Sequence, residues 1–153
     1  MKFYISYFYN IRFFPRNLIP VSTAVWDPKW YHMNKGNDYI YIDKRGVING
    51  VRCRGLSPYK IHSECSNDCP LKEGKSCSFI EQYRQYLHSL DFTQVIYLIE
   101  HEVSKLRKDC NVCLIVYERP NNPCSERGPL IEWFNENGIE LVEWEEAMIN
   151  QEN

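Results

Sequence analysis

Residues 113–144 constrain the fold more than any other stretch, because they predict a strand, a loop, a helix and a second strand in succession. The run 113–117 is short, apolar and β-branched, which is typical of a strand buried on both faces of a sheet. Residues 118–123 are rich in Pro and Asn and cannot continue that strand. Helical spacing follows and stops at Asn137 and Gly138, which form a good C-terminal cap, and 139–144 make the second strand.

The loop that opens this helix is a candidate binding site. Open α/β sheets bind ligands outside the carboxyl ends of their strands, where backbone N–H groups and the helix dipole favour an anion. Arg127 adds a bidentate donor suited to phosphate or carboxylate, and it would also stabilise a thiolate at Cys124. The structural alternative is that Ser125 caps the helix, Glu126 sits in its first turn and Cys124 is a small buried residue.

Length and composition indicate one domain. A chain of 153 residues with 44% hydrophobic content can build a core of its own. We predict a single α/β domain over residues 1–144, with a mostly parallel sheet flanked by helices. Residues 37–78 are predicted as an insertion that holds a hairpin and a Cys-rich loop, and residues 145–153 as an acidic tail that frays.

Charge and hydropathy limit the classes of partner. The formal net charge of −2 argues against a coat for bulk nucleic acid, but it is compatible with a pocket for one anionic small molecule. No apolar run approaches the ~20 residues of a membrane span. The N-terminus carries charges and aromatics where a secretion leader would have an apolar core. We therefore expect a cytoplasmic protein with no membrane partner.

The N-terminal half supplies further predicted strands. Residues 3–8 are aromatic and β-branched, and 18–24 form a second short strand in which Pro20 indicates an edge or an irregular start. Residues 37–54 alternate around a turn and predict a hairpin that decorates the domain.

Residues 79–108 have helical spacing in two segments. The break lies at 89–93, with Asp91 or Thr93 as a potential N-cap. The second helix is expected to pack on the sheet and lead into the central strand.

Residues 25–32 concentrate aromatic side chains in a loop. Trp26 and Trp30, with Asp27 and Lys29 among them, would form a wall for a planar ligand. The alternative is that both Trp side chains plug the core.

A Cys-rich segment predicts a metal site. Seven Cys in a chain without a secretion signal suggest metal or thiol chemistry before disulfides. Turn-forming residues separate four ligands that could close round one structural Zn²⁺, namely His62, Cys65, Cys69 and Cys77. Cys53 competes with His62 as the fourth ligand. A Cys pair in a disulfide, unrelated thiols and an iron–sulfur cluster are the alternatives.

Several of these residues resemble one family. The segments 5–8, 19–22, 26–31 and 114–118, together with Arg12, Cys124, Glu132 and Trp133, are similar to the family numbered 488 among the domains of unknown function, and most similar to its phage and prophage branch. The resemblance spans about residues 3 to 144. Family members carry a Cys-His-Arg motif at a helix start, whereas Cys124 is followed here by Ser125, Glu126 and Arg127, so the His that could act as a base is lost.

The resemblance implies a small α/β domain with a pocket over the strand ends. The residues expected to line that pocket are Ser6, Arg12, Ser22, Lys29, Trp30, Glu118, Ser125 and Arg127. Aromatic, guanidinium and carboxylate groups in one place would suit a nucleotide or a nucleotide-derived anion.

Three functions follow from these features. The first is a phage-type protein that binds a nucleotide-like anion and sequesters a host defence signal. The second is an enzyme that cleaves a glycosidic or phosphate bond, with Glu118 or Cys124 as the catalytic group. The third is a protein that blocks a host protein by direct interaction.

Overall fold

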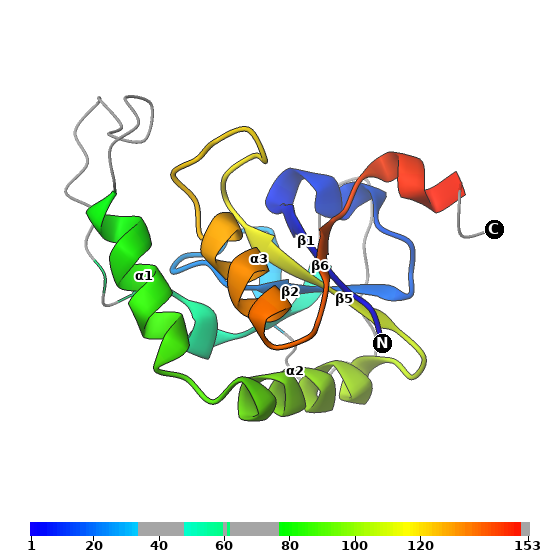
Figure 1. Cartoon of the computed structure of the whole chain (residues 1–153). Helices are drawn as coiled ribbons and strands as arrows, with labels where there is room; N and C mark the ends of the chain where they lie inside the picture. The colour runs from blue at the N-terminus through cyan, green and yellow to red at the C-terminus, as the bar shows by residue number, and fades with distance from the viewer. Residues whose placement is uncertain (34–47, 60, 62–76, 151–153) are drawn as a thin grey trace.

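Six parallel strands form the sheet of this computed structural model, which describes residues 1–33, 48–59, 61 and 77–150 (Figure 1). Their order is β3-β4-β2-β5-β1-β6, and every neighbouring pair runs parallel. The predicted α/β domain is thereby confirmed. The strands are β1 (Phe3–Tyr7), β2 (Leu18–Ser22), β3 (Tyr31–Met33), β4 (Ile48–Arg52), β5 (Asn111–Val116) and β6 (Leu141–Glu143).

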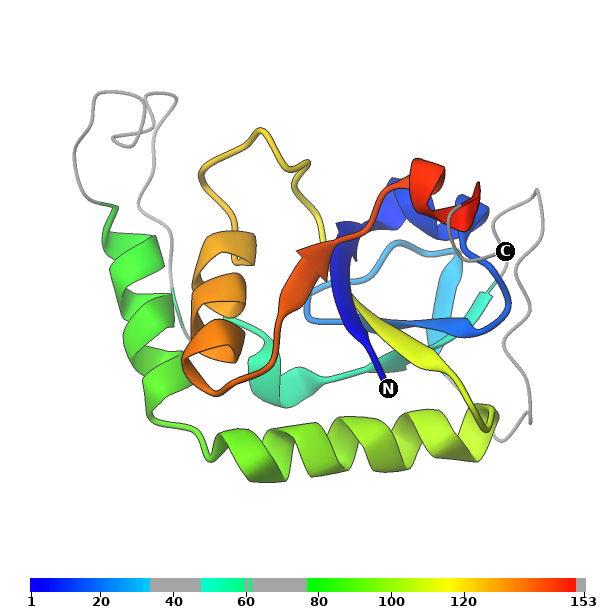
Figure 2. The same ribbon diagram turned by 45° about the vertical axis from the view of Figure 1, so that its right-hand side comes forward.

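Three helices cover one face of the sheet: α1 (Ser78–His88), α2 (Phe92–Leu106) and α3 (Arg127–Glu136). Alternate residues of β1, Phe3 and Ile5, pack into this layer with Trp133 and Phe134 of α3. In Figure 2, α2 lies below the strands, and α1 and α3 lie to their left. No helix within the described ranges is long and apolar enough to cross a membrane.

The opposite face carries two 3₁₀ segments, η1 (Phe8–Phe13) and η4 (Glu146–Asn150), with the segment that follows β2. Tyr4, Cys113 and Ile115 point to this side, as the period of two in a strand requires. Part of the predicted acidic tail is therefore ordered, because η4 places Met148 against this second cluster.

Pro20 does not mark a sheet edge, because β2 lies between β4 and β5. The backbone N–H and C=O groups of odd-numbered residues around β2 point to β5, as the bond from the Thr23 N–H to the Ile115 carbonyl shows. The backbone groups of Pro20 therefore point to β4. Pairing with β4 begins only at Val21, and the Pro20 carbonyl accepts a bond from the Tyr31 hydroxyl. The missing N–H of Pro20 thus falls where no ladder bond is formed.

β4 is the returning arm of the predicted hairpin. It lies between β3 and β2, parallel to both, and Val51 packs in the core. This strand is therefore part of the sheet and not a decoration. The other predicted arm, 39–42, lies outside the described residues.

Both predicted helix ends are confirmed. Gly138, with φ of +82°, follows α3, and the Ile139 N–H bonds back to the Phe134 carbonyl at 3.0 Å. At the start of α2, the Asp91 carboxylate accepts a bond from the Gln94 N–H at 3.2 Å.

The α2 cap gives a first testable prediction. Asp91→Ala should lower the free energy of unfolding by about 1 kcal/mol, because one N–H of the first turn loses its partner. Urea denaturation followed by circular dichroism measures this change. Thr93→Ala is the matched control and should cost less than about 0.5 kcal/mol; a larger loss for Thr93→Ala would place the cap there instead.

Candidate functional site

A crevice opens at the carboxyl ends of β2 and β4, where the chain leaves the two strands in opposite directions. The segment after β2 crosses to the face of η1 and packs Ala24 there, whereas the segment after β4 packs Leu56 on the side of α1. In Figures 1 and 2 both strand ends point toward the side where α1 and α3 lie. A parallel sheet binds ligands at such a switch point.

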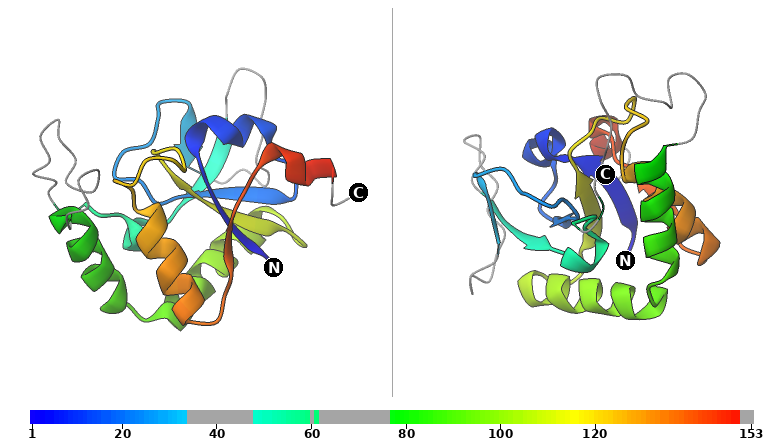
Figure 3. Two further views of the ribbon diagram at one scale, coloured as in Figure 1. Left: turned by 45° about the horizontal axis from the view of Figure 1, so that its top comes forward. Right: turned by 90° about the vertical axis from the view of Figure 1, so that its left-hand side faces the viewer.

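The crevice holds a pocket of about 610 Å³. Its lining comes from the segment after β2, from the end of β4 with the turn that follows it, and from α1. Figure 3 shows how the ribbons of these elements are arranged. The side chains that define its chemistry are Trp26, Arg52, Arg54, Ser57, Tyr59 and Tyr86.

The aromatic walls of this pocket are unusually exposed. Trp26 is 78% exposed and Tyr59 is 55% exposed, although large aromatic side chains gain most when they are buried. The ring of Tyr86 is fixed by its hydroxyl, which donates to the Gly55 carbonyl at 2.6 Å. Exposed rings around a hollow suit a planar ligand that would cover them.

The two Trp side chains of the predicted wall have different roles. Trp30 does not line the pocket, because it packs edge-on against Phe8 of the second cluster with ring centroids 6.0 Å apart. Trp26 lies in the pocket wall. Trp26 therefore fits the prediction of a ligand wall, and Trp30 fits the alternative of packing against the core.

The two arginines of the pocket also differ. The guanidinium of Arg52 donates to the carbonyls of Ala24 and Val25, and its Nε lies 3.6 Å from Asp27 Oδ2. Arg54 is exposed and forms no ion pair with another residue of the described chain. Arg54 is thus the cation available to an anionic ligand.

Ser57 adds a buried polar group to the pocket lining. The residue is 3% exposed, and its hydroxyl has no hydrogen bond within the described ranges. A buried polar group of this kind is costly unless something pairs with it. A polar atom of a bound ligand, or a water, would supply that partner.

In the loop that was expected to hold the anion, the anion-binding side chains are already paired with other groups of the protein. Arg127 is 6% exposed, its Nε lies 2.5 Å from Glu143 Oε1, and its Nη1 donates to the Glu118 carbonyl at 2.8 Å. The Ser125 hydroxyl donates to the Glu118 carboxylate at 3.2 Å and accepts from the Arg127 N–H at 3.1 Å. Arg127 and Ser125 therefore stabilise the start of α3 through bonds within the protein. For Ser125, this agrees with the structural alternative stated for the loop.

The remaining predicted residues do not converge on one point. Ser6 is fully buried and accepts a bond from the Asn10 amide at 3.0 Å. Arg12 lies in η1 with its guanidinium 4.0 Å above the Tyr9 ring, and Lys29 is exposed outside the pocket lining. Ser22 comes nearest to the pocket, because its hydroxyl bonds to Asp27, the partner of Arg52.

Neither predicted catalytic group lines the pocket. The Glu118 side chain is half-buried and engaged with Ser125, and Cys124 is half-buried in the loop before α3. The Cys124 N–H donates to Asn122 Oδ1 at 3.0 Å.

Glu126 is a notable acidic residue whose burial sequence reasoning did not predict. It is 7% exposed, and burial raises its pKa to about 8, with the charge of Glu118 acting in the same direction. The Thr23 hydroxyl and Arg127 act in the opposite direction. Nothing in the local sequence distinguishes it from an ordinary acid in a first helical turn, because its burial depends on how α3 packs against the end of β2.

The predicted zinc site cannot be placed from this structure. His62, Cys65 and Cys69 lie outside the described residues. Cys77 is buried directly before α1, and Cys53 is half-buried after β4. Among the described ranges, no three His, Cys, Asp or Glu side chains are arranged to hold a metal ion. Structural zinc stays a prediction.

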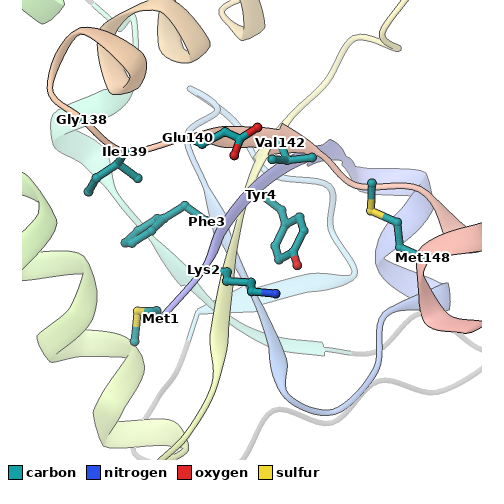
Figure 4. A pocket seen from close by; sticks show the side chains of 9 residues that line it. All are labelled: Met1, Lys2, Phe3, Tyr4, Gly138, Ile139, Glu140, Val142 and Met148. Atoms are coloured by element: carbon teal, nitrogen blue, oxygen red, sulfur yellow. The ribbon is translucent and has the colours of Figure 1, made fainter. Parts of the chain in front are cut away.

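A second hollow, of about 630 Å³, lies away from the strand ends (Figure 4). Its lining includes the largely apolar side chains Tyr4, Val142 and Met148 and the charged side chains Lys2 and Glu140. Because it sits beside β6 at the amino end of β1, it lacks the position expected for a ligand site of a parallel sheet.

Comparison with protein families, curated proteins and solved structures finds no match for this chain. The resemblance to family 488 stays a prediction.

Proposed function

We propose that this protein binds a nucleotide or a nucleotide-derived anion in the pocket at the ends of β2 and β4. The observation that carries the proposal is one hollow lined by exposed Trp26, exposed Tyr59 and Arg54, which has no ion pair within the described ranges. Every base has a π-face that can stack on such rings, and a guanidinium binds phosphate bidentately.

The charges of the pocket favour a ligand with a single phosphate group. Arg52 pairs with Asp27, so among the described pocket residues Arg54 is the arginine left to meet a phosphate. The hydroxyl of Ser57 offers a further hydrogen bond to a base or a sugar.

Binding is favoured over turnover because the described pocket lining holds no carboxylate, thiol or imidazole. A binding protein without turnover can act by sequestration. Together with the resemblance to a phage branch, this supports a role in which the protein sequesters a signalling nucleotide in the cytoplasm of a host cell.

Titration with the common ribonucleoside 5′-monophosphates tests the proposal. The emission of Trp26 should change on saturation, because a stacked base alters the environment of its ring. Trp26→Ala and Arg54→Ala should each weaken binding roughly 10- to 100-fold, as expected for the loss of one stacking contact or one charged hydrogen bond. The parent should prefer adenosine 5′-monophosphate to adenosine, and Arg54→Ala should bind the two alike.

Arg12→Ala is the matched control for that titration. It removes an exposed arginine of η1 that stacks on Tyr9 outside the pocket, so affinity should stay that of the parent. The absence of saturable binding in the parent, or an equal loss in Arg12→Ala and Arg54→Ala, would contradict the proposal.

An enzyme is the second candidate. It is based on the observation that the charge of Glu118 raises the pKa of the buried Glu126. Two carboxyl groups with different protonation can act as acid and base on a glycosidic or phosphate bond. Since neither group lines the pocket, this candidate ranks below binding.

A further inference from the structure

The Thr23 hydroxyl lies between two oxygen atoms. Thr23 Oγ1 is 3.0 Å from the Ile115 carbonyl and 3.0 Å from Glu126 Oε2. A hydroxyl has one proton to donate, and a carbonyl or an ionised carboxylate can only accept. With Glu126 ionised, the one hydroxyl proton of Thr23 is shared between two acceptors. With Glu126 protonated and donating to Thr23, each contact has a proton of its own.

The surroundings of Glu126 agree with a neutral carboxyl. It is 7% exposed, and the charged or titratable groups that face it are Glu118 after β5, Arg127 of α3 and Tyr83 of α1. Arg127 is committed to Glu143, while Glu118 repels a second negative charge. An ionised Glu126 would therefore be poorly compensated.

We propose that Glu126 is a protonated carboxylic acid at neutral pH and that its hydrogen bond to Thr23 positions the wall of the ligand pocket. Glu126 is on this account a positioning residue. The effect on the ligand rests on the proposed function, whereas the protonation of Glu126 does not.

A short segment connects Thr23 to the pocket. The carbonyls of Ala24 and Val25 accept from Arg52, and Val25 and Trp26 line the pocket. Thr23 is the anchor of this segment on the β2 side, where its N–H and its hydroxyl both bond to the Ile115 carbonyl. If Glu126 ionises, its carboxylate attracts the single hydroxyl proton of Thr23, which weakens the bond to the Ile115 carbonyl.

Ligand affinity should consequently fall as Glu126 titrates. We expect adenosine 5′-monophosphate to bind the parent about tenfold more weakly at pH 9 than at pH 7, the effect of one lost charged or buried hydrogen bond. The phosphate itself is doubly ionised over most of this range. Adenosine, which carries no phosphate, should show the same pH midpoint and thus excludes titration of the ligand.

Glu126→Gln is the decisive variant, because its amide keeps a donor to Thr23 at every pH. Its affinity should match that of the parent at pH 7 and stay level to pH 9. Glu132→Gln, a partly exposed acid on the same helix, should keep the pH profile of the parent. A Glu126→Gln profile that still falls with the parent's midpoint would overturn the proposal.

Infrared spectroscopy gives a readout that needs no ligand. A protonated carboxyl has a C=O stretch distinct from that of carboxylate, and the part of this band that is missing from Glu126→Gln should be present in the parent at pH 7 and disappear as pH rises past about 8. Its absence at pH 7 would overturn the proposal. If the band is present but no nucleotide binds, the protonation of Glu126 stands and the nucleotide-binding function fails.

Discussion

Arg127→Ala is expected to lower the free energy of unfolding by about 3–5 kcal/mol at neutral pH, because it leaves a charge uncompensated in the interior. The Glu143 carboxylate is Arg127's partner at 2.5 Å, and its side chain is only 22% exposed. The Glu118 carbonyl would also lose the bond from Arg127 Nη1. Urea denaturation followed by circular dichroism measures the loss.

Arg84→Ala is the matched control for this change. Arg84 also pairs with a glutamate, since its Nε lies 3.0 Å from Glu132 Oε2, but its side chain is 33% exposed, so the loss should be below about 1 kcal/mol. Replacing the Arg127–Glu143 pair together by Met and Leu should recover much of the stability. Equal, small losses for Arg127→Ala and Arg84→Ala would contradict a structural role for Arg127.

Glu126→Gln is expected to remove a large pH dependence of stability. The pKa of Glu126 is about 8 in the folded chain, against an ordinary value of 4.5. The folded state therefore holds the proton more tightly than the unfolded state. Its contribution is fully present below about pH 4.5 and is lost as pH rises to about 8, by roughly 1.4 kcal/mol per pH unit.

The difference between parent and Glu126→Gln isolates this contribution. The pKa of Glu143 is also raised, chiefly by burial, and gives a slope of the same sign in both proteins. Urea midpoints measured from pH 5 to pH 8 should show the parent losing about 4 kcal/mol relative to the variant. Parallel pH profiles would show that Glu126 is ionised throughout this range.

The elements of the fold were predictable where their signals are local. The strand, loop, helix and strand of residues 113–144 depend on apolar spacing and on Gly138, and the start of α2 depends on Asp91, each within a few residues of its effect. The position of Pro20 was not predictable, since it depends on where pairing with β4 begins.

The general position of the candidate site was predictable from the sequence, but most of its residues were not. A ligand position at strand ends follows from a parallel sheet, and Trp26 was among the expected wall residues. From the sequence, Arg127 was expected to be available to a ligand. Its partner Glu143 belongs to β6, and local sequence does not show that the two side chains meet. Arg54 and Tyr59 lie in a stretch that was predicted as an insertion, and only the parallel pairing of β4 with β2 brings them to the crevice.

Native mass spectrometry is the most direct test of nucleotide binding by this protein. The protein would be measured as purified from cells, and again after addition of an equimolar mixture of ribonucleoside 5′-monophosphates. We expect one nucleotide-mass adduct per chain that is lost on denaturation and is absent from Trp26→Ala. Identical spectra of the bare chain for the parent and Trp26→Ala, with and without the mixture, would contradict it.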